Sequence, residues 1–414
     1  MAGTAKTRRE LSADAIARAR EAGHELVRRT PVLSSRTIAR RCGAPAVALK
    51  AENLQRTGSF KLRGALAKLA ALGDAAKAGV VTGSAGNHAQ SLAYAAQARG
   101  VPCEVFMPAG SSIAKADSAA DLGARVQVVE GPVDDSIAAA HARARDGGLA
   151  FVHPFDDLDV IAGQATLGLE LLEDVADLAK VIVPVGGGGL ACGVAIAIKT
   201  QRPDVEVVGV QAEVCAPFAD ALRTGGAPAA RPASALTIAD GIAVKAPGAL
   251  TLDLARGWLD GVETVGEDAV AEAMVVLLER AKLVVEGAGA VGVAALLEGR
   301  VAPAARGTTA AVLSGGNVDA GLLAAIVRRH ETESGRRLVL LTRISDRPGG
   351  LAALLGHVAA TGANLVDVSH VREGLDLHVR ETAVELVLET RGQPHARAIE
   401  SALEAAGYAV QVVR

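Results

Sequence analysis

Short runs of β-branched residues alternate along the chain with Ala- and Leu-rich stretches, and this alternation constrains the fold most. The runs expected to be strands are residues 78–81, 103–107, 126–129, 181–185, 205–210 and 309–313. The residues expected on one helix face between two of them are Ala89, Leu92, Ala93 and Ala96. Their i, i+3, i+4, i+7 spacing is that of an amphipathic helix. Apolar strands separated by helices predict an α/β fold with parallel sheets covered on both faces by helices.

Length and charge limit the classes of protein that this chain can belong to. At 414 residues it can form two or three domains, taking about 150 residues per domain. Half of the residues are apolar but only 2% are aromatic, so the cores are expected to be aliphatic. A formal net charge of -3 without a long basic run argues against nucleic acid as a partner. Because no apolar run reaches about 18 residues, no membrane helix is expected.

The cysteines and the N-terminus indicate the compartment. Cys42, Cys103, Cys192 and Cys215 are far apart and form no C-x-x-C pair. Neither a zinc or other metal site nor a disulfide framework is therefore predicted. Met1–Leu11 is polar and lacks the apolar core of a signal peptide. We expect a reduced, cytoplasmic protein.

A change in composition near residue 330 predicts a domain boundary. We expect one domain over residues 1–330, a polar linker over 331–337 and a second domain over 338–414. The elements expected in the second domain are a strand at 338–342, a helix at 351–360, strands at 364–369 and 382–388, a helix at 396–406 and a strand at 408–413. This βαββαβ order is the ferredoxin-like plan.

Lys61 stands at a position where a lysine can be chemically active. It follows the small, hydroxyl-rich turn Thr57–Ser59, lies next to Phe60 and opens an Ala/Leu-rich helix. Burial there would lower its pKa from the ordinary value of about 10.4 and leave some free amine. Free amine is what a lysine needs to form a Schiff base with a carbonyl cofactor such as pyridoxal phosphate. By itself the segment is weak evidence, because most lysines are solvated surface residues.

Glycines at residues 186–189 follow an apolar strand and precede a helix that opens at Leu190. Backbone N–H groups without side chains can approach an anion closely, and the helix N-terminus adds a favourable dipole. The run therefore predicts a phosphate site, with an ordinary tight turn as the alternative. A dinucleotide site fits less well, because it requires a spaced G-x-G-x-x-G and an acidic residue after the next strand. Residues 207–211 contain no such acid.

Two further segments follow expected strands. Ser84–His88 offers a hydroxyl and exposed N–H groups that suit a carboxylate, although Ser and Asn also favour ordinary helix N-caps. Ser314 follows a β-branched strand, and Gly315 and Gly316 keep the space beside it open. The pair Asp156–Asp157 is compatible with an acid–base role or, more commonly, a solvated loop. The turn at Glu286–Ala288 is left open between lining a site and shaping the backbone.

Five segments in this order carry a family resemblance. They are residues 57–65, 84–88, 186–190, 237–241 and 314–317. Together they resemble the fold-type II pyridoxal-phosphate enzymes, and specifically the threonine and serine ammonia-lyases, also called threonine dehydratases. The resemblance runs from about Ser12 to about Arg329. It implies two parallel-type α/β subdomains, the smaller of them, roughly residues 53–155, inserted in the larger.

The resemblance also implies roles for individual residues. Lys61 is the implied catalytic residue, which bonds the cofactor and removes the substrate's Cα proton. The implied cofactor-binding residues are Phe60, Lys61, Asn87, Gly186, Gly187, Gly188, Gly189, Leu190 and Ser314. Asn87 would bond the ring hydroxyl, and Ser314 would face the ring nitrogen and leave it neutral. The implied substrate-binding residues are Ser84, Ala85, Gly86, Asn87 and His88, although a structural role is more common for His88.

The implied reaction converts L-threonine to 2-oxobutanoate and ammonia, and L-serine to pyruvate, by elimination of water. Serine racemases share most of these motifs but carry a hydroxyl where this chain has Ala85, which cannot transfer a proton. They also bind a divalent cation through a glutamate at a place that matches Gln211 here. The first departure favours elimination over racemisation. The second argues against a divalent metal site, and a monovalent ion held by backbone carbonyls near that place stays open.

The turn at residues 344–351 resembles the first turn of an ACT domain, a family of amino-acid-sensing modules. The residues implied to hold an effector are Asp346, Pro348, Gly349, Gly350 and Leu351. The expected effector is a branched amino acid, isoleucine or valine. Because ACT modules usually pair, the resemblance also implies a homo-oligomer, a dimer or a tetramer.

Two alternatives stay open at this stage. One is another fold-type II lyase or synthase, such as threonine synthase or a serine β-replacement enzyme. The loop at residues 84–88 and the ACT-like segment favour the dehydratase over these. The other alternative is an amino-acid-binding sensor with an inactive core. The presence of Lys61, the glycine run and Ser314 together argues against that.

Overall fold

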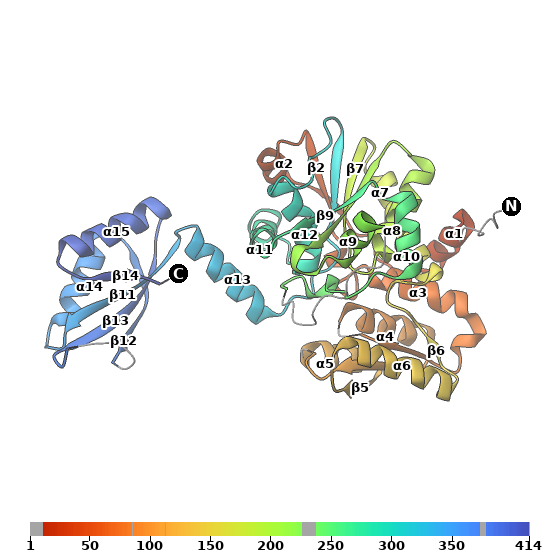
Figure 1. Ribbon diagram of the computed structural model, residues 1–414, viewed down its shortest axis with the longest axis horizontal. Coiled ribbons are helices and arrows are strands. Elements are labelled where there is room, and N and C mark those ends of the chain that lie inside the picture. Colours follow the sequence, from red (N-terminus) through yellow and green to blue (C-terminus); the bar gives the residue numbers. More distant parts are fainter. Residues whose placement is uncertain (1–10, 85, 112, 226–236, 373–377, 414) are drawn as a thin grey trace. The chain divides into compact units, whose positions relative to one another are not determined.

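The computed structural model describes residues 11–84, 86–111, 113–225, 237–372 and 378–413. It divides into two compact units, Met1–Val318 and Asp319–Arg414 (Figure 1). The first unit holds two parallel-type sheets with helices, and the second holds an antiparallel sheet with helices. The predicted α/β architecture is confirmed. Within the described residues, no helix is long and apolar enough to cross a membrane.

The larger sheet of the first unit has the strand order β1-β2-β10-β7-β8-β9. Its strands are β1 Val32–Ser34, β2 Ala46–Lys50, β7 Leu178–Pro184, β8 Glu206–Ala212, β9 Gly261–Val265 and β10 Thr308–Val312. Every pairing is parallel except that of β1 with β2. The carboxyl ends of the parallel strands therefore meet at one edge, which is where open α/β sheets bind ligands.

Strand β7 is buried on both faces, as its continuous apolar sequence predicts. Val181 and Val183 belong to a core with helices α7, α8 and α10, whereas Ile182 lies against Gly292 of α12. The helices of the first unit around this sheet are α1 Ala13–Ala22, α2 Arg36–Cys42, α7 Leu158–Asp174, α8 Gly189–Gln201, α9 Pro217–Thr224, α10 Ala249–Trp258, α11 Glu267–Val276 and α12 Gly287–Leu297. Two-sided helical cover explains why the strands carry so few polar residues.

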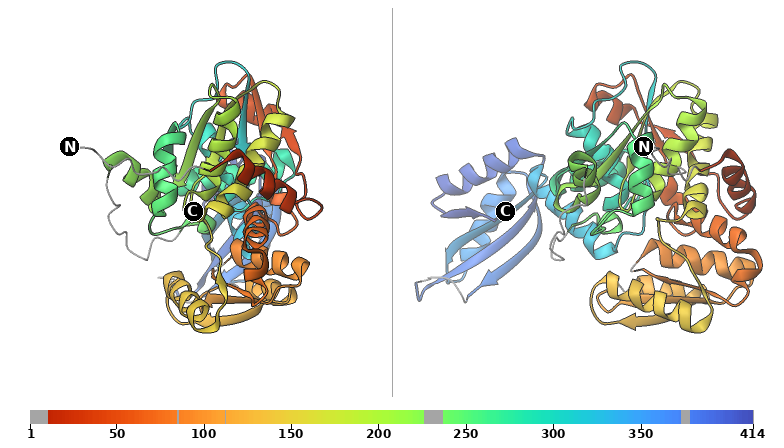
Figure 2. Two further views of the ribbon diagram at one scale, coloured as in Figure 1. Left: turned by 90° about the vertical axis from the view of Figure 1, so that its right-hand side faces the viewer. Right: turned by 45° about the vertical axis from the view of Figure 1, so that its right-hand side comes forward.

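The smaller sheet has the order β5-β4-β3-β6, and all of its pairings are parallel. Its strands are β3 Val80–Gly83, β4 Cys103–Pro108, β5 Arg125–Val129 and β6 Ala150–Phe151. Its helices are α3 Lys61–Leu72, α4 Asn87–Arg99, α5 Ile113–Asp121 and α6 Val133–Gly147. Figure 2 shows these elements, coloured orange to yellow-brown, as a lobe of their own. All four strands fall within residues 53–155, the range expected for the inserted subdomain.

The second unit begins with helix α13, Ala320–Glu333. The βαββαβ elements that follow are β11 Arg337–Ser345, α14 Gly350–Ala360, β12 Asn364–Val371, β13 Glu381–Glu389, α15 Gln393–Ala405 and β14 Val410–Val412. The sheet order β12-β13-β11-β14 is antiparallel throughout, as the ferredoxin-like plan predicts.

The segment expected to be a linker, residues 331–337, is partly helical. Helix α13 continues through Glu333, and β11 begins at Arg337. Asp319 caps the helix by accepting hydrogen bonds from the N–H groups of Gly321 and Leu322, and Arg329 pairs with Glu333 one turn later. Composition alone does not separate a polar linker from such a solvated helix, because both are rich in charged residues.

Candidate active site

One cavity lies at the carboxyl edge of the larger sheet, with an empty volume of about 560 Å³ that is partly open to solvent. Its lining residues are Phe60, Lys61, Asn87, Pro154, Phe155, Gln164, Pro184, Gly186, Gly187, Gly188, Gly189, Leu190, Gly241, Ile242, Val244, Glu286, Ala288 and Ser314. Each of the five sequence motifs thus contributes at least one residue to the lining. Pro184 ends β7 and Ser314 follows β10, which is where a parallel sheet places ligands.

Backbone pairing brings Lys61 and Ser314 together although they are far apart in sequence. Ser59 forms a bridge with Gly315. The N–H of Phe60 donates to the carbonyl of Ser314 at 3.1 Å, and the N–H of Gly316 donates to the carbonyl of Gly58 at 2.9 Å. The turn before Lys61 is therefore fastened to the end of β10.

Lys61 is the first residue of α3, and its side chain forms part of the cavity wall. Its Nζ donates to the carbonyl oxygen of Pro154 at 2.8 Å and lies 5.3 Å from the centre of the Phe60 ring. Burial lowers the pKa of Lys61 to about 8, although the nearby Glu286 carboxyl opposes that shift. The direction is the one predicted for a desolvated amine.

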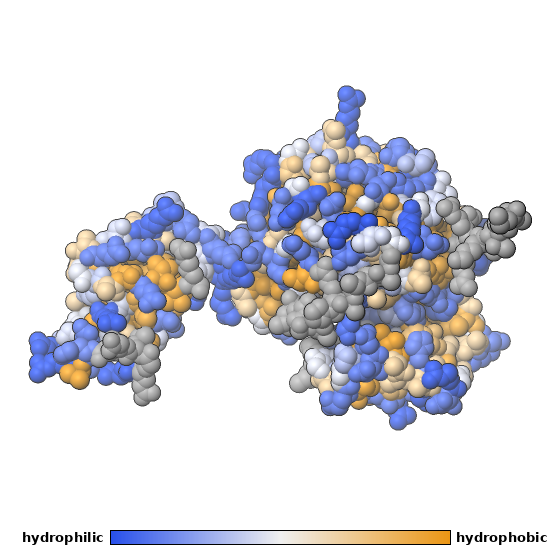
Figure 3. All heavy atoms as spheres, viewed as in Figure 1, coloured by the Kyte–Doolittle hydropathy of each residue, from blue (hydrophilic) through white to orange (hydrophobic). Residues whose placement is uncertain are grey.

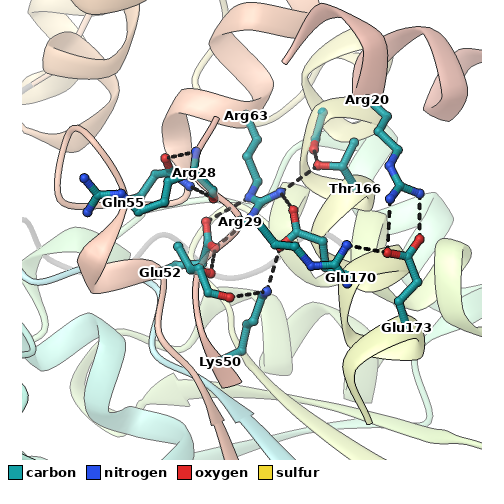
Figure 4. Close-up of polar contacts among 12 residues, drawn as sticks. Arg20, Arg28, Arg29, Lys50, Glu52, Gln55, Arg63, Thr166, Glu170 and Glu173 are labelled. Atoms are coloured by element: carbon teal, nitrogen blue, oxygen red, sulfur yellow. Dashed lines mark hydrogen bonds and ion pairs between the residues drawn. The ribbon is translucent and has the colours of Figure 1, made fainter. Parts of the chain in front are cut away.

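A buried group of ion pairs anchors the same turn of α3 (Figure 4). Arg63 donates twice to Glu52, at 2.8 Å each, and to Glu170 at 2.7 and 2.9 Å. Lys50 donates to Glu170 at 2.6 Å. Burial disfavours the guanidinium, but the two carboxylates outweigh it and raise the pKa of Arg63. This bidentate arrangement holds α3 against β2 and α7.

The glycine run provides backbone surface that no other residue could provide. Gly188 has φ +93°, and a Cβ there would lie 2.4 Å from the Phe218 ring. A Cβ on Gly187 would lie 2.3 Å from the Phe155 ring. Among the described residues, no side chain caps the first turn of α8, which begins at Gly189. An uncapped helix N-terminus behind a glycine cradle suits a phosphate group.

Asn87 is held in a chain of amide hydrogen bonds. Its Nδ2 donates to Glu286 Oε1 at 2.8 Å, and its Oδ1 accepts from Asn317 Nδ2 at 2.8 Å. Asn317 also donates to the carbonyl of Thr57 at 2.9 Å. These partners fix the orientation of the Asn87 amide, so that an N–H is directed toward the cavity lining.

Glu286 is a site residue that sequence reasoning did not assign. It precedes α12, is 4% exposed and lines the cavity. Burial raises its pKa to about 7, with Asp240 adding to the rise and the Asn87 hydrogen bond opposing it. The glycine after it was its one visible signal. A Cβ on Gly287 would lie 2.2 Å from the carbonyl of Ile238, so the chain can pass there only without a side chain.

The expected substrate loop, residues 84–88, is spread over different surroundings. Ala85 lies outside the described residues. The N–H of Gly86 donates to Ser84 Oγ at 3.3 Å, and Asn87 is the described loop residue that lines the cavity. His88 is buried, with Nε2 3.1 Å from the carbonyl of Val152, and burial lowers its pKa to about 3. This places His88 in the core of the smaller lobe.

The residues present fit pyridoxal phosphate. The cavity combines a desolvated lysine, a glycine cradle at a helix N-terminus, an oriented amide at Asn87 and a hydroxyl at Ser314. Comparison with known proteins agrees with that fit. The family described as pyridoxal-phosphate dependent enzyme matches residues 24–315. The chain belongs to this family.

Similarity to individual enzymes is more specific than the match to the family. The chain is 44% identical to an L-threonine ammonia-lyase of Thermotoga maritima, over 94% of this chain and 96% of that protein. It is 43% identical to an L-threonine ammonia-lyase of Geobacter sulfurreducens over the same shares of both proteins. Among solved structures, a threonine deaminase of T.th. matches with a TM-score of 0.69 and 40% identity, covering 74% of this chain and 99% of that one. Maize serine racemase matches with a TM-score of 0.71 and 32% identity, covering 77% and 98%.

Proposed function

We propose that this chain is a cytoplasmic enzyme that deaminates L-threonine to 2-oxobutanoate and ammonia, and L-serine to pyruvate, by β-elimination of water. The observation that carries the proposal is Lys61, whose amine has a pKa lowered to about 8 at a cavity shared with the glycine run and Ser314. The two L-threonine ammonia-lyases that match nearly the whole chain support this substrate class.

Pyridoxal phosphate, when bound, supplies an electron sink for the negative charge that develops at the substrate's Cα. The residues that would hold it are Gly186–Gly189 at its phosphate, Asn87 at its ring hydroxyl, Ser314 at its ring nitrogen and Lys61 at its carbonyl carbon. A serine hydroxyl opposite the ring nitrogen would leave the ring uncharged. That suits elimination, in which the leaving group departs at once and less delocalisation is needed.

Lys61 is suited to act as the general base at the substrate's Cα. A pKa of about 8 leaves part of the amine unprotonated at neutral pH. That fraction is roughly a tenth at pH 7, whereas an ordinary lysine would leave about one in 2,500. A positioned base of this kind contributes about 10²–10⁴-fold to a rate.

Racemisation is the second reaction to weigh, since serine racemases share the fold. It requires a second proton-transfer group on the face of the Cα opposite Lys61. The sequence position where racemases carry that hydroxyl is Ala85, a methyl side chain without a proton to transfer. We therefore expect elimination to outrun racemisation on L-serine.

The test measures the release of 2-oxo acid and ammonia from L-threonine and L-serine by purified protein with pyridoxal phosphate. Wild type should turn over both substrates, and Lys61→Ala should lose at least about 10²-fold. Lys77→Ala is the matched control, because Lys77 is an exposed lysine paired with Asp74 on the surface; its rate should equal that of wild type.

Each of three outcomes of this test would contradict the proposed function. Full activity in Lys61→Ala would exclude Lys61 as the base. Cofactor binding without release of 2-oxo acid would point to a synthase or β-replacement enzyme that needs a second substrate. Amino-acid binding with neither cofactor nor turnover would point to a sensor.

We further propose that the second unit is an ACT-type regulatory module that binds isoleucine or valine. Helix α14 begins at Gly350 behind Gly349, whose φ is +91°, and Asp346 pairs with Arg372 at 3.2 Å. The start of α14 behind Gly349 thus offers a helix N-terminus to a carboxylate, beside a charged pair. An activity titration that is flat for both amino acids would remove this proposal.

The same unit supports a homo-oligomer, a dimer or a tetramer. Edge strand β12 exposes Leu365 and Val366, 36% and 61% of their surface, and an exposed apolar edge is a site for pairing with another chain. Figure 3 shows apolar side chains reaching the surface of this unit among polar ones. Light scattering should give at least twice the chain mass of 41.8 kDa, and a monomer would contradict the proposal.

A further inference from the structure

The loop of residues 153–157, here called the His-Pro loop, joins the smaller lobe to α7. Its residues are His153, Pro154, Phe155, Asp156 and Asp157. The last four of these residues each contact a different part of the first unit, and the carbonyl of Pro154 accepts the hydrogen bond from Lys61. Whatever holds that carbonyl in place therefore also decides where the Lys61 amine points.

His153 closes the loop around Pro154. Its Nδ1 accepts hydrogen bonds from the N–H of Phe155 at 3.2 Å and of Asp156 at 2.7 Å, the two residues just after the proline. Its ring also meets that of Phe155 edge to face, with centres 4.6 Å apart. Burial lowers the pKa of His153 to about 4, so Nδ1 stays an acceptor at neutral pH.

Phe155 ties the loop to the glycine run. Its ring occupies the space where Gly187 would carry a Cβ, 2.3 Å away, and its carbonyl lies 2.8 Å from the corresponding point on Gly189. The loop thus lies directly behind the expected phosphate cradle. A shift of the loop would move both the carbonyl that holds Lys61 and the packing of the glycines.

The two acids of the loop cap helices. Asp157 Oδ1 accepts from the N–H of Asp159 at 2.9 Å at the start of α7. Asp156 Oδ1 accepts from the N–H of Thr251 at 2.9 Å in the first turn of α10. They lie in a loop after a strand, as one of the two interpretations expected, but that loop is half-buried. Both carboxylates are engaged, and Pro154 presents the group that reaches Lys61.

We propose that His153 is a positioning residue, which aims the Pro154 carbonyl so that it holds the free amine of Lys61 in line for proton transfer. The inference rests on the proposed role of Lys61 as base. A primary amine that donates one hydrogen to a fixed oxygen loses rotational freedom, and the direction of its lone pair is restricted. Misplacing a reacting group by about 1 Å can cost about 10²-fold in rate.

The closing experiment compares His153→Ala with His153→Asn in the full chain. An asparagine side-chain oxygen accepts hydrogen bonds from the N–H groups two and three residues on, as in an Asx turn, and these are the bonds that His153 makes. His153→Ala should lower kcat for L-threonine by about 10- to 100-fold with KM little changed. It should also raise the isotope effect with α-deuterated threonine. His153→Asn should recover most of kcat and the wild-type isotope effect.

A second readout does not depend on turnover. In cofactor-free protein, Lys61 is labelled with an amine-acetylating reagent and quantified by mass spectrometry. His153→Ala should label Lys61 about two- to tenfold faster, the equivalent of one lost hydrogen bond. His153→Asn should label it at the wild-type rate. Ser35→Ala, which removes the N-cap of α2, controls for a general loss of stability and should change neither labelling nor the isotope effect.

The inference is overturned if His153→Ala lowers only the melting temperature while kcat, isotope effect and labelling stay as in wild type. It is equally overturned if His153→Asn behaves like His153→Ala in all three. Failure of the proposed function looks different. In that case wild type itself does not turn over threonine, whereas the labelling comparison still reports whether His153 holds Lys61.

Discussion

Two cationic residues at the start of α3 stand two positions apart, Lys61 half-buried at the cavity and Arg63 fully buried, and their pKa values move in opposite directions. Arg63 meets Glu52 and Glu170 through paired hydrogen bonds, and its pKa is raised. Lys61 donates to the neutral carbonyl of Pro154, and its pKa falls to about 8. Burial acts on both. The hydrogen-bond partner determines whether the side chain stays charged, as in Arg63, or can lose its proton, as in Lys61.

The comparison separates structural from chemical use of a buried charge. A locked guanidinium fixes the position of α3 but can take no part in proton transfer. An amine without a carboxylate partner at hydrogen-bond distance can exist in both protonation states near neutral pH, which is what a general base requires. The structural use of Arg63 makes the chemical use of Lys61 possible, because the turn that carries Lys61 is anchored through Arg63.

The largest effect is expected for Arg63→Ala. It leaves Glu52 and part of Glu170 buried without their partner, which typically costs about 3–5 kcal/mol. Denaturant unfolding of the cofactor-free protein measures it. A loss below about 1 kcal/mol would show that the buried pairs do not anchor α3, and the contrast with Lys61 would fail.

Glu286→Gln should have a smaller, pH-dependent effect. The pKa of Glu286 is raised to about 7 in the folded chain, above the value of about 4.3 expected when unfolded. Folding stability from this group is therefore present below about pH 4 and lost as pH rises toward 7. The glutamine keeps an acceptor for Asn87 without the charge, so it should be more stable than wild type by about 1–3 kcal/mol above pH 7. The prediction would be wrong if the difference in free energy of unfolding between Glu286→Gln and wild type were the same at pH 5 and at pH 8.

Lys61→Met tests the other side of the comparison. The folded pKa of about 8 lies below the unfolded value, so the ammonium destabilises the fold below pH 8. That cost disappears as pH rises toward about 10.4. The variant should be inactive yet more stable than wild type at pH 7, by about 1 kcal/mol. The gain should vanish by about pH 10. A loss of stability at pH 7 would mean that the Pro154 hydrogen bond outweighs desolvation.

The smallest effect is expected for Arg20→Ala. Arg20 pairs with Glu173 at 2.6 Å, but the two side chains are 49% and 38% exposed. Such pairs typically contribute about 0.2–1 kcal/mol and weaken with salt. Urea unfolding at low and high salt should show a small difference that closes as salt is added. A loss as large as that of Arg63→Ala would show that exposure does not separate the two pairs.

The architecture could be predicted because it depends on local patterns repeated along the chain. Apolar strands such as β7, with helices between them, already require two-sided cover, and the ferredoxin-like order of the second unit was visible for the same reason. Helix α13 was not visible. Its charged residues are equally typical of a linker. The cap at Asp319 can be recognised only in the folded helix.

The site residues differ in the same way: some are marked by local sequence patterns and others only by contacts in the folded protein. Lys61, the glycine run and Ser314 are announced by short motifs, and they line one cavity. Arg63 lies in the same segment as Lys61, but nothing there shows that it is buried, because an arginine two residues after a lysine usually indicates a solvated surface. Glu286 contacts Asn87 across a long stretch of chain, and only the glycine after it marks it in the sequence. His153 bonds its own loop, two and three residues on, but that loop matters only because Pro154 reaches Lys61 in the folded protein.

The fastening of residues 58–60 to residues 314–316 has a consequence for biosynthesis. Strand β2 lies beside β10, and the turn before Lys61 rests on Gly315. Ser314 and Asn317 leave the ribosome long after Lys61, so a growing chain that has not yet reached β10 lacks one wall of the cavity. A reactive amine and its aldehyde cofactor can therefore meet in a finished pocket only when synthesis of the first unit is complete.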